Sequence, residues 1–443
     1  MLTQPEARRL HDRVLTLVRA TKGAEATVAV RSAREGNTRF ALNEISTSGD
    51  VERLDITLTV QFGLRSASAV TNQLDDRSID DLVGRVIRMA RLAPENPEQM
   101  PVLGRQSYLA SKGAVDPATA KLAPELRAKA VGAAIAAGDA AKVQIAGFFS
   151  HGATSVALAS SAGMAAYHEA TSCGFSCTAR TADGTGSGWA GAESNRFADF
   201  DAAALARVAV DKATSSARPK KLEPGRYTVI LEPAAVGSLL SFFVGALDAR
   251  RADEGRSFFS KNPPGKKLFP DTITLRSDPA DGALGAQPFD GDGLPLAATR
   301  WVDHGTLTGL AYDRYWAKKQ GKSPTGFPGG WTLDGGTATR DELIKGVSRG
   351  VLITRFWYLR ALDRPSLMAT GLTRDGVYLI ENGVITHPVN NFRFNESPVQ
   401  MLARCDGLGP TAIPGDGGGR DGNSRVPMLR THEFNLASVS DAV

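Results

Sequence analysis

Residues 55–62 read Asp55-Ile56-Thr57-Leu58-Thr59-Val60-Gln61-Phe62 and alternate polar and apolar side chains without interruption. This period of two predicts a strand with one buried face. Upstream, Thr3 and Glu6 form a capping box for a helix, whose apolar residues recur at Leu10, Val14, Leu17 and Val18. Downstream, a second helix is predicted after Ser78, with one apolar side formed by Ile79, Leu82, Val83, Val86 and Ile87. The order helix, strands, helix predicts an α+β fold.

The rest of the chain divides at a polar segment that contains two prolines. Before it, residues 125–138 predict an Ala-rich helix, and residues 144–189 predict strands separated by glycine turns. The segment from Ser215 to Gly225 has no hydrophobic period, which is typical of a linker. After it, a strand is predicted at residues 227–231 and a helix at 234–249, followed by glycine-rich strands. We therefore expect an N-terminal α/β sandwich-like domain with an antiparallel sheet (residues 1–217) and a β-rich C-terminal domain (residues 218–443).

The composition is that of an ordinary soluble globular protein with many turns. The 443 residues include 46 glycines and 23 prolines, more than the roughly 12% that is usual for these two residues together. The 52 Lys and Arg exceed the 47 Asp and Glu by only 5, and no basic block stands out, so nucleic acid and membranes are not expected partners. Three cysteines cannot form a disulfide framework, which favours a cytoplasmic location.

The first candidate metal site groups His168 and Glu169 with Cys173 and Cys177. The flanking residues alternate as in a strand, where side chains five positions apart point to opposite faces. His168 and Cys173 then cannot share one ion, whereas Cys173 and Cys177 share a face. We expect two buried, reduced cysteines in a sheet rather than a metal site.

Two glycine-rich segments resemble ligand-binding motifs but lack the necessary context. Gly417 to Gly422 satisfies GxGxxG, yet no strand precedes it and Pro427 follows, so a loop is expected rather than a dinucleotide site. Asp290-Gly291-Asp292-Gly293 has no distal acidic ligand for calcium and predicts a turn. GxSxG and HExxH motifs are absent from the sequence.

Several ordered segments resemble the TldD/PmbA family, also called the modulator of DNA gyrase family. In the second half, Pro288–Pro295, Trp301–Leu307, Asp313 and Ser323–Gly326 are similar to its FDDEG, lid-G-vL, D and sTG series. Gly376–Val389 is similar to the family's IENGEI-x-x-PV strand pair, and Thr38–Asn43 to its tRFA segment. Their order and spacing span almost the whole chain.

The resemblance also implies which kind of family member this is. TldD-type members are zinc metallopeptidases with an HExxxH helix, and TldE (PmbA) types are partners without that motif. Alignment of the corresponding stretch places Ser241 and Ala246 at the two histidines and Phe242 at the glutamate. None of these side chains ligates zinc or activates water. The family's third ligand, a cysteine, falls near Pro414 to Asn423, which contains none. We expect a TldE-type chain with no catalytic residue, metal or other cofactor.

Such a chain is expected to form a heterodimer with a TldD-type metallopeptidase that degrades or processes unfolded peptides, with strand edges offered to an extended peptide. Two alternatives remain open. One is a stand-alone peptidase that uses His168, Glu169 and a cysteine, and the other is a homodimeric binding or regulatory protein. The aromatic segment Arg355–Arg360 is a candidate interface or cavity wall, with a core strand as the alternative interpretation.

Overall fold

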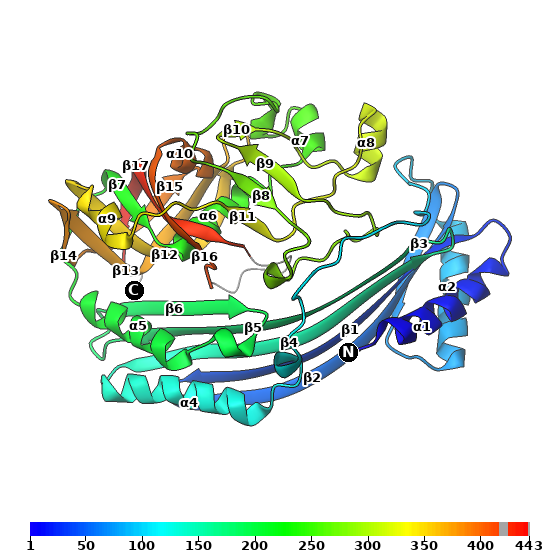
Figure 1. Ribbon diagram of the computed structural model, residues 1–443, viewed down its shortest axis with the longest axis horizontal. Coiled ribbons are helices and arrows are strands. Elements are labelled where there is room, and N and C mark those ends of the chain that lie inside the picture. Colours follow the sequence, from blue (N-terminus) through cyan, green and yellow to red (C-terminus); the bar gives the residue numbers. More distant parts are fainter. Residues whose placement is uncertain (416–423, 442–443) are drawn as a thin grey trace.

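The computed structural model describes residues 1–415 and 424–441, and the chain has the predicted α+β fold (Figure 1). The helices and strands of the first half are α1 (Gln4–Arg19), β1 (Glu25–Ala41), β2 (Glu44–Phe62), β3 (Arg65–Thr71), α2 (Asp76–Leu92), α3 (Pro117–Ala120), α4 (Pro124–Ala140), β4 (Gln144–Ser160), β5 (Ala165–Arg180), β6 (Ser187–Ser194) and α5 (Ala202–Ser215). Those of the second half are β7 (Gly225–Leu231), α6 (Pro233–Val244), α7 (Ala249–Asp253), β8 (Leu275–Ser277), β9 (Thr299–Asp303), β10 (Thr306–Leu307), α8 (Arg314–Gln320), β11 (Trp331–Leu333), α9 (Arg340–Lys345), β12 (Arg349–Asp363), β13 (Met368–Glu381), β14 (Val384–Pro388), β15 (Asn391–Glu396), α10 (Pro398–Ala403), β16 (Cys405–Ala412) and β17 (Val426–Ser440).

The N-terminal half is built on one antiparallel sheet with the strand order β3-β2-β1-β4-β5-β6. The predicted strand at residues 55–62 is the second half of β2, and Ile56, Leu58 and Val60 are fully buried, as the alternation requires. The β1–β2 hairpin turns at Leu42 and Asn43, both with positive φ (51° and 61°). Two such residues match the right-handed twist of a hairpin. The Asn43 side chain accepts a hydrogen bond from the backbone N–H of Ile145 (2.7 Å), which ties the turn to β4.

Helices cover one face of this sheet (Figure 1). α1 and α2 pack over β1, β2 and β3, and α4 and α5 pack over the other end of the sheet. α1, α2 and α4 lie where the sequence predicts helices: α1 and α2 carry apolar residues at helical spacing, and α4 is rich in alanine. The helix-covered face therefore holds the core of the N-terminal half.

An ion pair that is buried only on its arginine side joins α4 to β2. The side chain of Arg127 is fully buried and donates to both carboxylate oxygens of Asp50 (2.9 and 3.1 Å). This guanidinium holds the pKa of Asp50 below its usual value. Gly36 on β1 lies beside this pair: it is opposite Asp50 on the neighbouring β2 and opposite His151 on the neighbouring β4. A Cβ atom on Gly36 would lie 2.3–2.4 Å from atoms of all three side chains.

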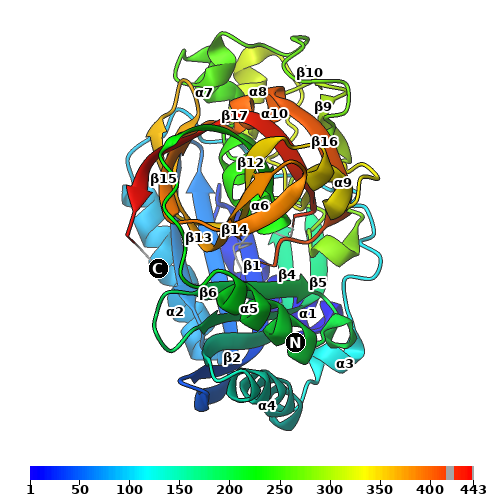
Figure 2. The ribbon, with the colours of Figure 1, turned by 90° about the vertical axis from the view of Figure 1, so that its left-hand side faces the viewer.

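Five strands of the C-terminal half close into a ring. β12 pairs with β7, β7 with β17, β17 with β15 and β15 with β13, and β13 pairs back with β12. β14 and β16 extend this sheet, and α6 lies within the outline of the ring in the view of Figure 2. α6 packs against β12 and β17, and its apolar side chains are buried in the largest core of the molecule. A second, four-stranded sheet has the order β10-β9-β8-β11.

The predicted helix at residues 234–249 is interrupted, which corrects the sequence analysis. α6 ends at Val244, where Gly245 is the C-cap residue. The Asp248 carboxylate then accepts a hydrogen bond from the backbone N–H of Arg251 (3.2 Å) and starts α7. An aspartate in this N-cap position begins a new helix rather than continuing the old one.

The C-terminal half lies on the sheet face opposite the helices (Figure 1). Phe289 is fully buried there against Leu158 and Ala166 of the sheet. The hydroxyl of Tyr108 donates to the carbonyl oxygen of Gly293 (2.8 Å) and joins the same contact. Residues 216–224 connect α5 to β7, and a domain boundary at 217/218 remains a prediction. Across the described ranges, 1–415 and 424–441, every helix is too short or too polar to span a membrane.

Gly36→Ala is expected to destabilise the fold. The new methyl group has no room unless the Arg127–Asp50 pair moves, and overpacking of this kind costs about 1–3 kcal/mol. The matched control is Gly49→Ala on the adjacent strand, where a Cβ atom would meet nothing within 4 Å. Thermal and urea unfolding should show a lowered midpoint for Gly36→Ala alone. Equal midpoints for the two variants would contradict the proposed role of the pair.

Acidification is expected to destabilise the fold through His11 on α1. Burial lowers the pKa of His11 to about 4, and the Nε2 atom is buried without a hydrogen-bond partner. In the unfolded chain the imidazole has its ordinary pKa of about 6.5, so protonation below that pH favours unfolding. The stabilisation is present above pH 6.5 and is lost as the pH falls towards 4. Between pH 7 and 5 this one group contributes a loss of about 2 kcal/mol.

Urea unfolding of His11→Leu measures this contribution. The free energy of unfolding should fall less between pH 7 and pH 5 in His11→Leu than in the unaltered protein, by the contribution of His11. His304→Gln changes an exposed histidine and should show the full fall. An unchanged pH dependence in His11→Leu would show that other groups are responsible.

Candidate functional site

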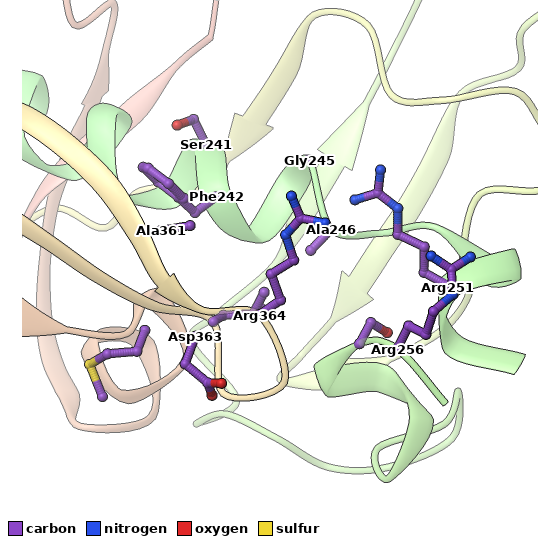
Figure 3. Close-up of a pocket in the computed structure, with 12 residues that line it drawn as sticks. Ser241, Phe242, Gly245, Ala246, Arg251, Arg256, Ala361, Asp363 and Arg364 are labelled. Atoms are coloured by element: carbon purple, nitrogen blue, oxygen red, sulfur yellow. The ribbon is translucent and has the colours of Figure 1, made fainter. Parts of the chain in front are cut away.

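The structure brings the three motif positions to one pocket. Ser241, Phe242 and Ala246 line a cavity of about 330 Å³ at the C-terminal end of α6 (Figure 3). Ser241 and Phe242 belong to the last turn of the helix, and Ala246 follows its Gly245 cap. This end of the helix is its most exposed part, because most side chains of the preceding turns are buried in the ring of strands.

The residues at these positions do not fit a zinc ion. Zinc in proteins is bound by histidine nitrogen, cysteine sulfur or carboxylate oxygen. The Ser241 hydroxyl donates to the carbonyl oxygen of Ser238 (2.8 Å), and Phe242 and Ala246 are apolar. Within residues 1–415 and 424–441, three or more His, Cys, Asp or Glu side chains nowhere gather as a metal site would require.

The expected location of the third zinc ligand is only partly described. Pro414 contacts α6, because a Cβ atom on Gly237 would lie 2.8 Å from the Pro414 ring. Residues 416–423 lie outside the described residues, and so does the GxGxxG match at 417–422. Cys405 is buried in β16, where burial raises the pKa of its thiol to about 11.

Arginines occupy the pocket instead of metal ligands. Arg251 and Arg256 approach from α7 and the residues after it, and Arg364 approaches from the turn between β12 and β13 (Figure 3). Asp363 is the carboxylate in the pocket lining. The pocket thus combines apolar walls with guanidinium groups, an arrangement suited to binding rather than to metal chemistry.

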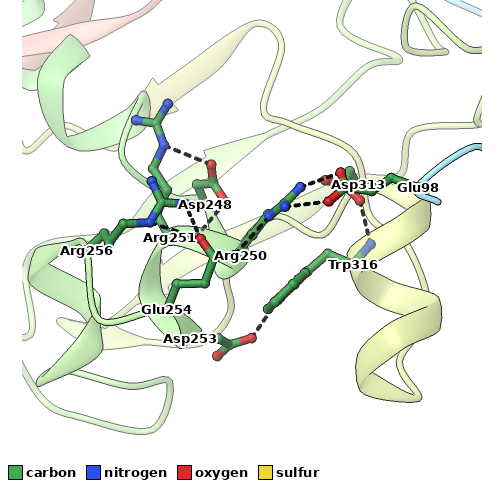
Figure 4. Close-up of polar contacts among 9 residues, drawn as sticks. All are labelled: Glu98, Asp248, Arg250, Arg251, Asp253, Glu254, Arg256, Asp313 and Trp316. Carbon is green, nitrogen blue, oxygen red and sulfur yellow. Dashed lines mark hydrogen bonds and ion pairs between the residues drawn. The ribbon is translucent and has the colours of Figure 1, made fainter. Parts of the chain in front are cut away.

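A network behind the pocket fixes α7 (Figure 4). Arg250 donates to both carboxylate oxygens of Glu98 (2.6 and 2.7 Å), which lies in the segment leading from the first sheet. Its Nε also donates to Glu254 (3.2 Å), and its guanidinium stacks on Trp316 at 5.3 Å from the ring centre. Arg250 therefore anchors α7 away from the pocket, while its neighbour Arg251 lines the pocket.

The arginines were not recognised as site residues from the sequence. The Arg250, Arg251 and Arg256 cluster directly after the altered motif is a local signal that could have found two of them. Arg364 lies more than a hundred residues further on, and only the β12–β13 hairpin brings it to the same pocket. No short sequence motif indicates that Arg364 lies near α6.

The structure keeps His168 apart from the cysteines, as the strand pattern predicts. Cys173 and Cys177 are buried on the face of β5 that packs under α4 and α5. His168 is an odd number of positions from both cysteines along an unbroken strand, so its side chain lies on the opposite face. Asp290 forms a turn in which its carboxylate accepts from the backbone N–H groups of Asp292 and Leu294 (both 2.9 Å).

The aromatic segment 355–360 is a core strand with an exposed face, and its role as an interface or cavity wall stays a prediction. Phe356 is buried in the core of the ring, whereas Trp357 and Tyr358 are 43% and 60% exposed. Arg355 lies over the rings of Trp189 and Trp357, at 4.4 and 5.0 Å from the ring centres. The segment is a core strand that also joins the two halves of the molecule.

The three cysteines are expected to be unreactive in the folded protein. Burial raises the pKa of Cys173 and Cys177 to about 12 and that of Cys405 to about 11, so the reactive thiolate is scarce at pH 8. Mass spectrometry after brief iodoacetamide treatment should find no alkylated cysteine in the native protein and all three alkylated in urea. Rapid alkylation of Cys173 or Cys177 in the native protein would contradict this expectation and favour the alternative in which a cysteine takes part in catalysis.

Comparison with known proteins gives consistent matches. The PmbA/TldA metallopeptidase central domain matches residues 115–217, and the C-terminal domain of the same family matches residues 224–438. A metalloprotease of Methanothermobacter thermautotrophicus is 26% identical over 223 residues, which are 46% of this chain and 47% of that protein. The chain thus matches about half the length of this curated relative.

Two solved structures share the fold over nearly the full length. A Thermotoga maritima protein named as a modulator of DNA gyrase has a TM-score of 0.86 at 17% identity, covering 97% of this chain and 99% of its own. TldE of Thermococcus kodakarensis has a TM-score of 0.86 at 15% identity, covering 97% and 100%. Together with the two family domains, which span most of residues 115–438, these findings show that the chain belongs to the PmbA/TldD metallopeptidase family.

Proposed function

We propose that this chain is a non-catalytic, TldE-type subunit that pairs with a TldD-type zinc metallopeptidase in the degradation or processing of unfolded peptides. One observation carries the proposal. The three positions that align with HExxxH line a single pocket, and the residues there supply neither a zinc ligand nor a general base. Loss of all three groups from an otherwise intact helix and pocket indicates that the site has been retained for another purpose.

The edge strands of the two sheets support a role in holding extended peptides. β14 lies at one edge of the C-terminal sheet and β3 at one edge of the N-terminal sheet. Such edges offer backbone donors and acceptors to an extended chain, whereas a folded protein has already paired its own strands. The fold shared with TldE of Thermococcus kodakarensis is consistent with the proposed subunit type.

The two alternative functions differ in their support. A stand-alone peptidase based on His168, Glu169 and a cysteine is not favoured, since His168 lies on the face of β5 opposite to Glu169 and the cysteines. A homodimeric binding protein shares the same pocket and differs from the first proposal only in its partner. We also propose a cytoplasmic location, because three buried thiols without disulfides suit a reducing compartment.

The isolated chain is expected to bind no stoichiometric zinc and to cleave no unfolded peptide. After co-expression with a TldD-type protein from the same organism, the two should copurify, and cleavage of a fluorogenic unstructured peptide should require the TldD-type protein and be abolished by a chelator. Zinc retained by this chain alone through dialysis, together with chelator-sensitive cleavage, would overturn the proposal. Purification of this chain as a homodimer that does not bind the co-expressed TldD-type protein would favour the binding-protein alternative.

A further inference from the structure

The charges that line the α6 pocket are arranged to receive an anion. Its lining contains three guanidinium groups, those of Arg251, Arg256 and Arg364, and one carboxylate, that of Asp363. That carboxylate is already engaged, because it accepts hydrogen bonds from the backbone N–H and the hydroxyl of Ser366 in the β12–β13 turn. Asp363 therefore shapes the turn that carries Arg364, and its carboxylate keeps its negative charge beside the three arginines.

The guanidinium groups retain donors for a ligand. The guanidinium of Arg364 forms no hydrogen bond or ion pair with any residue in the described ranges, 1–415 and 424–441, although its backbone carbonyl oxygen accepts from the N–H of Leu367 (3.2 Å). Arg251 pairs through its Nε with Asp248 (3.2 Å), and Arg256 pairs with Glu254. Each guanidinium carries five N–H donors, so these pairs leave donors available on both arginines.

The segments that carry the arginines are fixed by the surrounding fold. Asp248 caps α7 and also pairs with the Arg251 side chain, and the Arg250–Glu98 pair anchors the other side of the helix (Figure 4). Arg364 lies in a tight hairpin turn fixed by Asp363. A ligand that binds here meets guanidinium groups from two separate elements, which favours a defined geometry.

The remaining lining and the charge balance indicate which kind of anion fits. Phe242, Ala246, Leu367 and Met368 provide apolar walls beside the arginines. The positive charge of the three arginines is balanced by Asp363 and by the neighbouring Asp248 and Glu254. A site without strong excess charge suits a monoanion attached to an apolar group better than a phosphate or a nucleic acid.

We propose that the pocket at the end of α6 binds a carboxylate of an extended peptide through Arg364 and Arg251. A guanidinium pairs with a carboxylate through two parallel hydrogen bonds, and the apolar walls accommodate the adjoining side chain. The carboxylate comes from either the peptide C-terminus or an acidic side chain. This inference rests on the proposed role in peptide handling and specifies what the altered pocket recognises.

Fluorescence anisotropy with the isolated full chain tests this inference. The probes are three N-terminally labelled, unstructured ten-residue peptides: one without acidic residues that ends in a free leucine carboxylate, the same peptide as its C-terminal amide, and the amide with one internal glutamate. We expect the free acid or the glutamate peptide to bind about tenfold more tightly than the plain amide, the effect of one charge-assisted contact. Which of the two binds tightly identifies the source of the carboxylate.

Two variants locate the interaction. Arg364→Gln should abolish the preference for the carboxylate and leave affinity for the plain amide unchanged. The matched control is Arg360→Gln in the same hairpin, whose side chain stacks on Tyr358 and does not line the pocket. This control should keep the preference.

Three results would overturn the inference: no binding of any probe, equal affinity for all three probes, or a preference that survives in Arg364→Gln. These outcomes are separate from failure of the proposed function, because the assay needs no partner. A chain that copurifies with a TldD-type protein but shows no carboxylate preference refutes only this inference. A chain that prefers carboxylates but forms no such complex refutes only the pairing.

Discussion

The enclosure of α6 by the closed ring of strands is the constraint on which the pocket depends. Leu239, Leu240 and Phe243 have no exposed surface, and burial of each such side chain contributes about 1.5–3 kcal/mol. The helix is apolar on nearly all sides, so it is stable only where strands surround it. Its position is therefore fixed by packing, and its last turn reaches the surface at one defined place. Whatever residues stand at positions 241, 242 and 246 are presented there.

Local patterns in the sequence predicted most elements but not their long-range contacts. The alternation at residues 55–62 and the helical spacing in α1 and α2 were reliable because each element has one buried face, whereas α4 was predicted from its alanine content. The helix predicted at 234–249 was wrong at its end, since an all-apolar run carries no period that shows where the helix stops. The identity of the altered site came from family resemblance. The approach of Arg364 to this site depends on a hairpin turn remote in sequence, which no local pattern encodes.

The pocket is physically linked to the arrangement of the two halves of the molecule. Adjacent residues of α7 face different ways, Arg251 towards the pocket and Arg250 towards Glu98 (Figure 4). Any movement of the segment that carries Glu98 acts directly on the helix that positions Arg251. Arg355, between Trp189 and Trp357, forms a second such connection at the far side of the ring. The pocket and the N-terminal sheet therefore share structural support.

The ring of strands also has a consequence for synthesis of the protein on the ribosome. The N-terminal sheet needs only residues 25–194, so it is able to form early. β7 pairs with β12 on one side and with β17 on the other, and about two hundred residues are made between β7 and β17. Until residues 426–440 emerge, β7 and β15 have unpaired edges, and exposed edges of this kind promote aggregation. Chaperone dependence during translation should thus be concentrated in the C-terminal half.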